Sequence, residues 1–281
     1  MTHDRSATGR AASSSLVRSW RHFRLATHVL QGVLTIALCY PLCSAHVHRR
    51  LRQRWSRRLL GIVGVEVRID GHAVTPGALL VSNHISWLDI YAINTLTPSA
   101  FVSKAEVRDW PVIGWLAAKS ETVFLRRGSR GHARIVNGEI TALLDAGRNV
   151  AIFPEGTTTD GSHVLPFHAA LLQAAIESGH PVQPVALSYH TEDGRHTTAA
   201  AYDGDISLGR CLANIVSHRR LVVRVHVASA RATGPATLRR ELAHATRDTI
   251  AELASRPLSA LAPATAVATG CQAASQQRDA G

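Results

Sequence analysis

From Gly64 onward, short apolar runs alternate with segments of helical pattern, and this alternation constrains the fold more than any other feature of the sequence. Near-continuous apolar strands that alternate with helices are typical of a sheet covered by helices on both faces. We therefore expect an α/β domain with a mixed, largely parallel sheet. The expected strands are residues 65–69, 78–82, 100–103, 122–125, 149–153, 182–189 and 221–227. The expected helices are residues 86–94, 109–118, 132–146, 167–178 and 235–254, with Gly147 as the C-cap of the third.

Positive charge is concentrated at the N-terminal end of the chain. The formal net charge is +11, and residues 1–60 hold eleven arginines against a single aspartate. Eleven minus one gives +10 for this segment, so the other 221 residues carry only +1. A nucleic-acid-binding surface spread over the main body would need a basic balance there. We therefore expect no nucleic-acid partner.

An uncharged apolar stretch interrupts these arginines at residues 25–45. Its 21 residues would form a helix about 31 Å long, close to the thickness of a bilayer core. His28, Gln31 and Pro41 weaken it as a simple span, so a helical hairpin lying in one leaflet is an equally good interpretation. The basic run at residues 48–58 is expected to form an amphipathic helix on anionic lipid headgroups.

The same apolar stretch predicts where the protein lies in the cell and where its domains begin and end. A cleaved secretory signal is disfavoured, because six arginines follow the apolar stretch directly and favour the cytoplasmic side. We predict attachment to the inner (cytoplasmic) membrane, with the main body facing the cytoplasm. The expected division is a membrane-binding helical segment at residues 1–60, an α/β domain at 61–257 and a disordered tail at 258–281.

The stretch "SNHISWLD", residues 82–89, places a histidine and an aspartate five positions apart after a strand-like run. In a strand this odd spacing points His84 and Asp89 to opposite faces, and in a helix it leaves them about 140° apart. The two side chains can therefore meet only if the chain turns between them. His84 would then leave the strand, and Asp89 would lie in the first turn of a helix.

Two interpretations of this pair stay open. Ser86 and Asp89 form a capping-box pattern, in which Asp89 merely accepts hydrogen bonds from amides at a helix start. Alternatively, Asp89 orients the imidazole of His84, which acts as a general base. No G-x-S-x-G elbow supplies a serine nucleophile, so a catalytic pair would favour transfer to a substrate hydroxyl or amine over hydrolysis.

Cationic residues follow two other predicted strands. In "FLRRGSR", residues 124–130, Arg126 and Arg127 suit a phosphate or a carboxylate, although a solvated basic turn has the same composition. Lys104, one of only two lysines in the chain, also follows a strand and is a weaker candidate for the same role.

Two further blocks complete the set of candidates. "FPEGTTTDG", residues 153–161, puts Glu155, Gly156 and Thr157 in a loop that could surround a ligand or form a plain turn. Pro184 interrupts the apolar run "VQPVALSY", which favours an edge strand or an irregular wall. No H-E-x-x-H pattern or pair of C-x-x-C motifs occurs, so we expect no metal site.

Taken in order, these four blocks resemble the glycerophospholipid acyltransferase family, whose best-known bacterial members are 1-acyl-sn-glycerol-3-phosphate acyltransferases. The N-H-x-x-x-x-D block of the family matches Asn83, His84 and Asp89, and its F-[IVL]-x-R block matches residues 124–127. Its F-P-E-G-T block matches residues 153–157, and its fourth block matches residues 182–185. The resemblance covers about residues 60–230.

The resemblance implies that His84 is the general base on the acceptor hydroxyl and that Asp89 orients it. The acceptor would attack the thioester of acyl-CoA or acyl-carrier protein, used as a co-substrate, and no cofactor would be needed. The resemblance also assigns acceptor binding to residues of the second and third blocks. These map onto Arg126, Arg127, Glu155, Gly156 and Thr157, with Lys104 as an additional contact.

Two departures from the family pattern leave the acceptor open. The second block often begins with glycine and carries aspartate before the arginine, where this chain has Glu121 and Arg126. The longer match "FPEGTTTDG" followed by "LPF" also resembles members that acylate lyso-ornithine lipid. Phosphatidic acid synthesis is therefore the leading expectation and lyso-ornithine lipid acylation its rival. A thioesterase-like hydrolase and a non-catalytic membrane protein are weaker alternatives.

Overall fold

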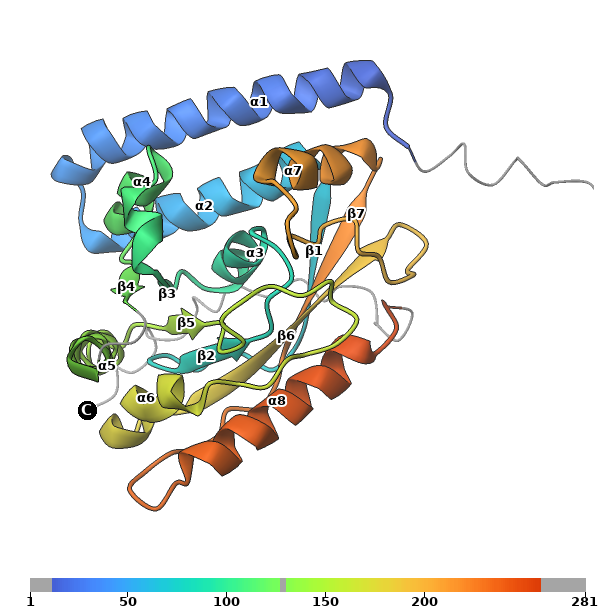
Figure 1. Cartoon of the computed structure of the whole chain (residues 1–281). Coiled ribbons are helices and arrows are strands. Elements are labelled where there is room, and N and C mark those ends of the chain that lie inside the picture. The colour runs from blue at the N-terminus through green and yellow to red at the C-terminus, as the bar shows by residue number, and fades with distance from the viewer. Residues whose placement is uncertain (1–11, 127–129, 259–281) are drawn as a thin grey trace, which may run out of the picture.

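The computed structural model describes residues 12–126 and 130–258, which form a seven-stranded sheet between two layers of helices (Figure 1). The strand order is β1-β7-β6-β2-β5-β3-β4. Neighbouring strands are parallel except β6 and β7, so the expected mixed, largely parallel sheet is confirmed. The strands are β1 (Val65–Gly71), β2 (Leu79–Ser82), β3 (Ala100–Lys104), β4 (Val123–Leu125), β5 (Val150–Ile152), β6 (Val182–Thr191) and β7 (Leu221–Val227).

Helices cover both faces of the sheet, as the sequence predicted. Alternate residues of a strand point to opposite faces, so Leu80 joins one core, and Leu79 and Val81 join the other. The first core is closed by α2 (Ala45–Val63), α3 (Asp89–Leu96) and α7 (Leu208–Ser217). The second is closed by α5 (Arg130–Asp145), α6 (Gln173–Ser178) and α8 (Arg239–Ser255).

The helices begin later than the sequence predicted at several points. The helix expected at residues 86–94 begins at Asp89, because residues 87 and 88 form a turn. The helix expected at 109–118 is α4 (Ile113–Lys119), which a short 3-10 helix (Ala105–Asp109) precedes. The segment 167–178 starts as a 3-10 turn (Ala169–Leu172) before α6, and the segment 235–254 becomes helical only at Arg239.

The end of α5 is confirmed, whereas α7 was missed. Gly147 has a φ of +69° and donates its N–H to the carbonyl of Leu144, which makes it the expected cap. Helix α7 begins after Ser207, whose side chain accepts the N–H of Arg210. That serine was the available signal for a helix start.

The interpretation of Pro184 as a mark of an edge strand is wrong, because β6 lies between β2 and β7. The antiparallel ladder between β6 and β7 ends at Val185 and Val227, one residue short of the proline. Pro184 can still accept a hydrogen bond there, from the N–H of Ala228. The carbonyl of Ala228 accepts instead from the side-chain amide of Gln183, at 3.0 Å. This amide supplies the donor that a proline lacks.

The N-terminal residues form a helical hairpin against the first core. Helix α1 (Ser15–Leu34) continues as a π-turn (Thr35–Cys39) and a 3-10 turn (Tyr40–Leu42), and the chain then returns as α2. His28 on α1 stacks on Trp55 of α2 with 4.6 Å between ring centroids. His28 Nε2 lies 3.0 Å from the Trp55 carbonyl, and Trp55 Nε1 donates to the His28 carbonyl at 3.1 Å. These paired contacts join the two helices.

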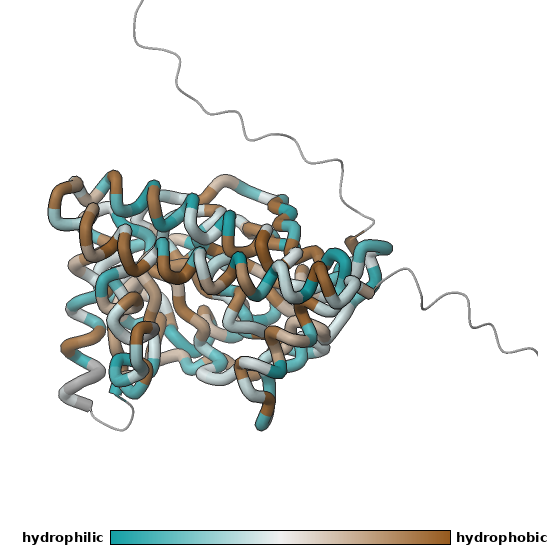
Figure 2. The backbone as a smooth tube through the Cα atoms, turned by 90° about the horizontal axis from the view of Figure 1, so that it is seen from above, coloured by the Kyte–Doolittle hydropathy of each residue, from teal (hydrophilic) through white to brown (hydrophobic). Residues whose placement is uncertain are grey.

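Most of the large apolar side chains of α1 point away from the protein. They recur at helical spacing and include Leu16 (81% exposed), Phe23 (59%) and Leu30 (58%). The inner face buries His28 and Gly32 and packs Leu25 against the first core, so most of the large apolar side chains are left on the outer face. Figure 2 looks down on this outermost helix and shows hydrophobic residues recurring along it. The stretch Ser15–Leu42 is long and apolar enough to cross a membrane, judged by length and composition.

The basic run at residues 48–58 does form a helix, within α2, but this helix lies beneath α1. Its apolar side joins the core through Leu59 and Leu60, and the guanidinium of Arg57 donates to the carbonyl of Thr95 on α3. The side chains available to lipid therefore come mainly from α1. Helix α2 runs to Val63, past the expected boundary at residue 60, and the division into a 1–60 segment and a 61–257 domain stays a prediction. Most of the expected tail, residues 259–281, lies outside the described residues.

Candidate active site

His84 and Asp89 are in contact at the carboxyl end of β2. His84 Nδ1 lies 2.9 Å from Asp89 Oδ2, and the chain between them turns from the strand toward α3. This is the turn that the five-residue spacing required. The Asp89 side chain is fully buried, whereas the His84 side chain is 21% exposed. Protein therefore surrounds the carboxylate of Asp89, whereas the imidazole of His84 is partly exposed.

Four hydrogen bonds hold the Asp89 carboxylate. Oδ2 accepts from the His84 ring and from the N–H groups of Ile85 (2.7 Å) and Ser86 (2.9 Å). Oδ1 accepts from the hydroxyl of Tyr189 on β6, at 2.7 Å. The bond from the Ser86 N–H to Asp89 is one half of a capping box, whereas the Ser86 hydroxyl accepts the N–H of Leu88, two residues further on rather than three. The capping and orienting interpretations of Asp89 therefore hold together in one structure.

This arrangement leaves Nε2 as the basic nitrogen of His84. An ionised carboxylate only accepts hydrogen bonds, so Nδ1 must carry the proton and Nε2 the lone pair. Nε2 has no hydrogen-bond partner among the described residues, and the ring lines a cavity. Phe153, directly after β5, stacks on the ring with 4.0 Å between centroids and an angle of 13°. The imidazole is thus fixed on one face and available at Nε2.

Glu155 holds the backbone beneath this ring. Its Oε1 accepts the N–H of His84 and its Oε2 accepts the N–H of Leu165, both at 2.8 Å. Burial raises the pKa of this carboxyl, and the two amide donors oppose the rise. Both oxygens are engaged by backbone, and Glu155 does not line the cavity. The sequence predicted a substrate contact here, and that role stays a prediction.

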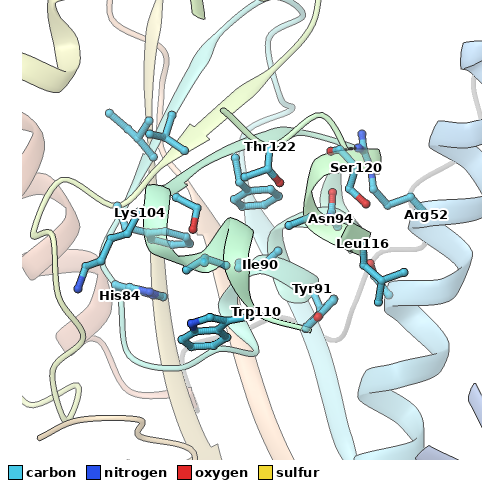
Figure 3. A pocket seen from close by; sticks show the side chains of 18 of the residues that line it. Arg52, His84, Ile90, Tyr91, Asn94, Lys104, Trp110, Leu116, Ser120 and Thr122 are labelled. Carbon is cyan, nitrogen blue, oxygen red and sulfur yellow. Dashed lines mark hydrogen bonds between the residues drawn. The ribbon is translucent and has the colours of Figure 1, made fainter. Parts of the chain in front are cut away.

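A cavity of about 1070 Å³ opens beside His84 and extends between the carboxyl edge of the sheet and the helical hairpin. Figure 3 shows His84 and Lys104 at one end of it, and Arg52, Asn94 and Ser120 at the other. The wall between is largely apolar and includes Ile90, Tyr91, Phe101, Leu116 and Leu125. Its cationic lining residues are Arg52, Arg54, Arg58, Lys104 and Arg126, and the described lining includes no aspartate or glutamate.

The structure brings most of the predicted substrate contacts to this cavity. Those that line it are Lys104, Arg126, Gly156 and Thr157. They come together because β2, β3, β4 and β5 are parallel and end at one edge of the sheet. Arg127 lies outside the described residues. Within residues 12–126 and 130–258, no three potential metal ligands gather.

Three residues at or near the site were not predicted as site residues. Arg52 and His168 line the cavity, and Tyr189 holds Asp89. Arg52 comes from α2 and Tyr189 from a strand one hundred residues after Asp89. Such distant partners leave no mark on local spacing.

Glu121, where the family often has glycine, lies in a position that suits glycine. Its φ is +63°, in the left-handed region that side chains disfavour. Its carboxylate bonds the guanidinium of Arg148 (Nη1 to Oε1, 2.6 Å) and that of Arg52 (Nη2 to Oε2, 3.2 Å). Burial opposes ionisation of this carboxyl, but the two arginines outweigh it and lower its pKa. These contacts hold α2 against the turn before β4.

An oriented imidazole base beside an elongated, largely apolar cavity defines a site for group transfer to a lipid-like substrate. Comparisons with known proteins agree with this class. Residues 64–188 match the family model described as "Acyltransferase". The chain is 43% identical to the lyso-ornithine lipid O-acyltransferase of Pseudomonas aeruginosa over 181 residues, 64% of this chain and 69% of that protein. It is 41% identical to the 1-acyl-sn-glycerol-3-phosphate acyltransferase of Neisseria meningitidis serogroup B over 163 residues, 58% of this chain and 64% of that protein.

The fold of the chain also matches that of a known acyltransferase. The crystal structure of the 1-acyl-sn-glycerophosphate (LPA) acyltransferase PlsC from Thermotoga maritima superposes with a TM-score of 0.64 at 21% identity. The superposition covers 86% of this chain and 96% of that one. The chain belongs to the glycerophospholipid acyltransferase family and is an acyltransferase. Its reaction therefore joins an acyl group from a donor to a lipid acceptor.

Proposed function

We propose that this enzyme transfers an acyl group from acyl-CoA or acyl-carrier protein to the free hydroxyl of 1-acyl-sn-glycerol 3-phosphate, which gives phosphatidic acid. The observation that carries this choice of acceptor is the charge of the cavity. Its described lining has five cations and no carboxylate, and four of these cations remain when Arg52, which is bonded to Glu121, is set aside. A phosphate monoester matches guanidinium and ammonium groups in charge and geometry. The similarity to the Neisseria meningitidis enzyme supports the same acceptor.

The geometry of the pair supports a general-base mechanism. Nε2 of His84 takes the proton of the acceptor hydroxyl while its oxygen bonds to the thioester carbonyl carbon. Asp89 stabilises the imidazolium that forms, through Nδ1. When the tetrahedral adduct collapses, the carbon–sulfur bond breaks and the imidazolium returns the proton to the leaving thiolate. The apolar middle of the cavity would hold an acyl chain during these steps.

Acylation of lyso-ornithine lipid is the second candidate, and one observation favours it. The Pseudomonas aeruginosa relative of that name is 43% identical to this chain. An ornithine headgroup carries an ammonium as well as a carboxylate, so it would need an acceptor for its positive charge. The described cavity lining offers carbonyl and hydroxyl oxygens for this purpose but no carboxylate.

We predict that purified enzyme with one labelled acyl thioester acylates 1-acyl-sn-glycerol 3-phosphate much faster than lyso-ornithine lipid. Lys104→Gln should lower kcat/KM for the phosphate acceptor by about tenfold, as expected for loss of one hydrogen bond to a charged group. Lys119→Gln is the matched control, because the second lysine of the chain does not line the cavity. Product analysis by thin-layer chromatography separates the two acceptors.

Acylation of lyso-ornithine lipid alone would refute the phosphate acceptor while leaving the acyl transfer intact. Free fatty acid released at the same rate with no acceptor present would instead indicate a hydrolase. The same assay, run in parallel with acyl-CoA and acyl-carrier protein, identifies the donor.

We infer further that the enzyme lies on the cytoplasmic face of the inner membrane, with the outer face of α1 in the apolar layer. The exposed apolar side chains of α1 support this placement. So do the arginines of α1 and α2, because residues 15–63 contain no aspartate or glutamate that would repel anionic headgroups. Insertion from one side would let a lysolipid reach His84 without leaving the membrane.

The triple variant Leu30→Ser, Leu34→Ser, Leu38→Ser should bind vesicles at least tenfold more weakly, since each buried leucine contributes about 1.5–3 kcal/mol. Ile135→Ser on α5 is the control, because Ile135 is 59% exposed but distant from α1 in sequence and fold. Flotation with phosphatidylglycerol-containing vesicles measures both. Unchanged flotation of the triple variant would contradict this orientation.

A further inference from the structure

Tyr189 makes a contact that the mechanism above does not use. Its side chain is 1% exposed and projects from β6 into the first core. Its hydroxyl lies 2.7 Å from Asp89 Oδ1, the oxygen that faces away from His84. Among residues 12–126 and 130–258, no other donor bonds this oxygen. Among these residues, the Tyr189 hydroxyl is therefore the one hydrogen-bond donor to Asp89 Oδ1.

We propose that Tyr189 is a positioning residue of the His84–Asp89 pair: its hydroxyl orients the Asp89 carboxylate and sets the basicity of His84. This inference rests on the proposed role of His84 as the base. Oδ2 accepts from two N–H groups of the turn and from the His84 ring, whereas among the described residues Oδ1 accepts from Tyr189 alone. The phenol therefore adds a fixed point on the side of the carboxylate opposite to the imidazole, and its loss leaves a buried oxygen unpaired.

The phenol is suited to donate at every working pH. Burial raises the pKa of Tyr189 well above its ordinary value, and the negative charge of Asp89 raises it further. A hydroxyl that stays protonated withdraws charge from the carboxylate it bonds. It therefore weakens the attraction between Asp89 and a protonated imidazole of His84.

Other titratable groups face His84 from the elements around it. Glu155 lies beneath its backbone after β5, and Lys104 of β3, Arg126 after β4 and His168 line the same cavity. Tyr202 also lines it. Because the variants proposed here leave all five unchanged, a change in the titration of His84 reports on Tyr189.

The test is Tyr189→Phe, assayed for kcat/KM against pH in vesicles and for modification of His84 by diethyl pyrocarbonate, resolved by mass spectrometry. Loss of the donor strengthens the attraction between Asp89 and the imidazolium, so the acidic limb of the kcat/KM profile should move to higher pH. Protonation protects His84 from diethyl pyrocarbonate, so the pH at which modification sets in should rise as well. The maximal rate should fall on the order of tenfold, the factor expected for a hydrogen bond to a charged group.

Two further variants test the role of the Tyr189 hydroxyl. Incorporation of 3-fluorotyrosine at position 189 keeps the shape and makes a stronger donor, so both titrations should move to lower pH. Ser188→Ala is the matched control, because it removes a buried hydrogen bond to His190 on the opposite face of β6. It should lower thermal stability without moving either titration.

Unchanged titrations in both Tyr189 variants would overturn the inference and leave Tyr189 a packing residue. The chemical modification also separates this inference from the proposed function. If the modification of His84 shifts with pH and the catalytic profile does not, Tyr189 still tunes His84, and His84 is not the base.

Discussion

His84→Ala should lower kcat for acyl transfer by about 10²- to 10⁴-fold, the range that a positioned general base contributes. The imidazole is the only group of the pair that reaches the cavity, through Nε2. Its removal leaves the acceptor hydroxyl without a proton acceptor at the point of attack. KM should change less than kcat, because the cations assigned to the acceptor are untouched. A radioactive acyl-transfer assay at saturating acceptor measures the loss.

The chain offers a matched control for this variant. His180 Nε2 lies 2.7 Å from Asp145 Oδ1, and the His180 side chain is 24% exposed, close to the value for His84. This second His–Asp pair lies away from the cavity. His180→Ala should therefore keep full turnover. If His84→Ala retained more than a tenth of the wild-type rate, the general-base role would be wrong.

Asp89→Ala should abolish activity and also destabilise the fold. It leaves the N–H groups of Ile85 and Ser86 and the hydroxyl of Tyr189 without their acceptor in a fully buried site. Each buried polar group left unpaired costs about 1–3 kcal/mol, so the free energy of unfolding should fall by about 3 kcal/mol or more. Chemical denaturation followed by circular dichroism measures this loss.

Asp89→Asn separates the charge of Asp89 from its hydrogen bonds. An asparagine oxygen can accept from the turn, and its amide can donate to the Tyr189 oxygen, so stability should stay near wild type. The negative charge that supports the imidazolium is gone, and activity should fall on the order of 10³-fold. Asp145→Ala is the control, with a 60% exposed side chain. Wild-type activity in Asp89→Asn would show that Asp89 acts only as a cap.

Local patterns in the sequence predicted the sheet well. All seven strands occur where apolar runs predicted them, because a strand buried on both faces needs such a run. Helix starts were less predictable. The start of α3 shifted to Asp89, because the Asp89 carboxylate is drawn into the preceding turn by the N–H groups of Ile85 and Ser86.

The candidate site was predictable where its residues adjoin strand ends. His84, Lys104, Arg126 and Gly156 reach one cavity because parallel strands end at one edge. The position of β6 was not predictable, because Pro184 argues for an edge. In the structure the Gln183 amide donates to the Ala228 carbonyl in place of the N–H that the proline lacks.

Apolar periodicity and the spacing of four short blocks thus predicted the fold class, the family resemblance and the turn that joins His84 to Asp89, because each depends on residues close together in the chain. The tertiary structure decided how that pair is held and what surrounds it. Tyr189 reaches Asp89 from one hundred residues away, and Arg52 closes the far end of the cavity from the N-terminal hairpin. The outward apolar face of α1 likewise follows from which face packs on α2. Contacts between distant segments depend on packing, and packing is a property of the whole fold.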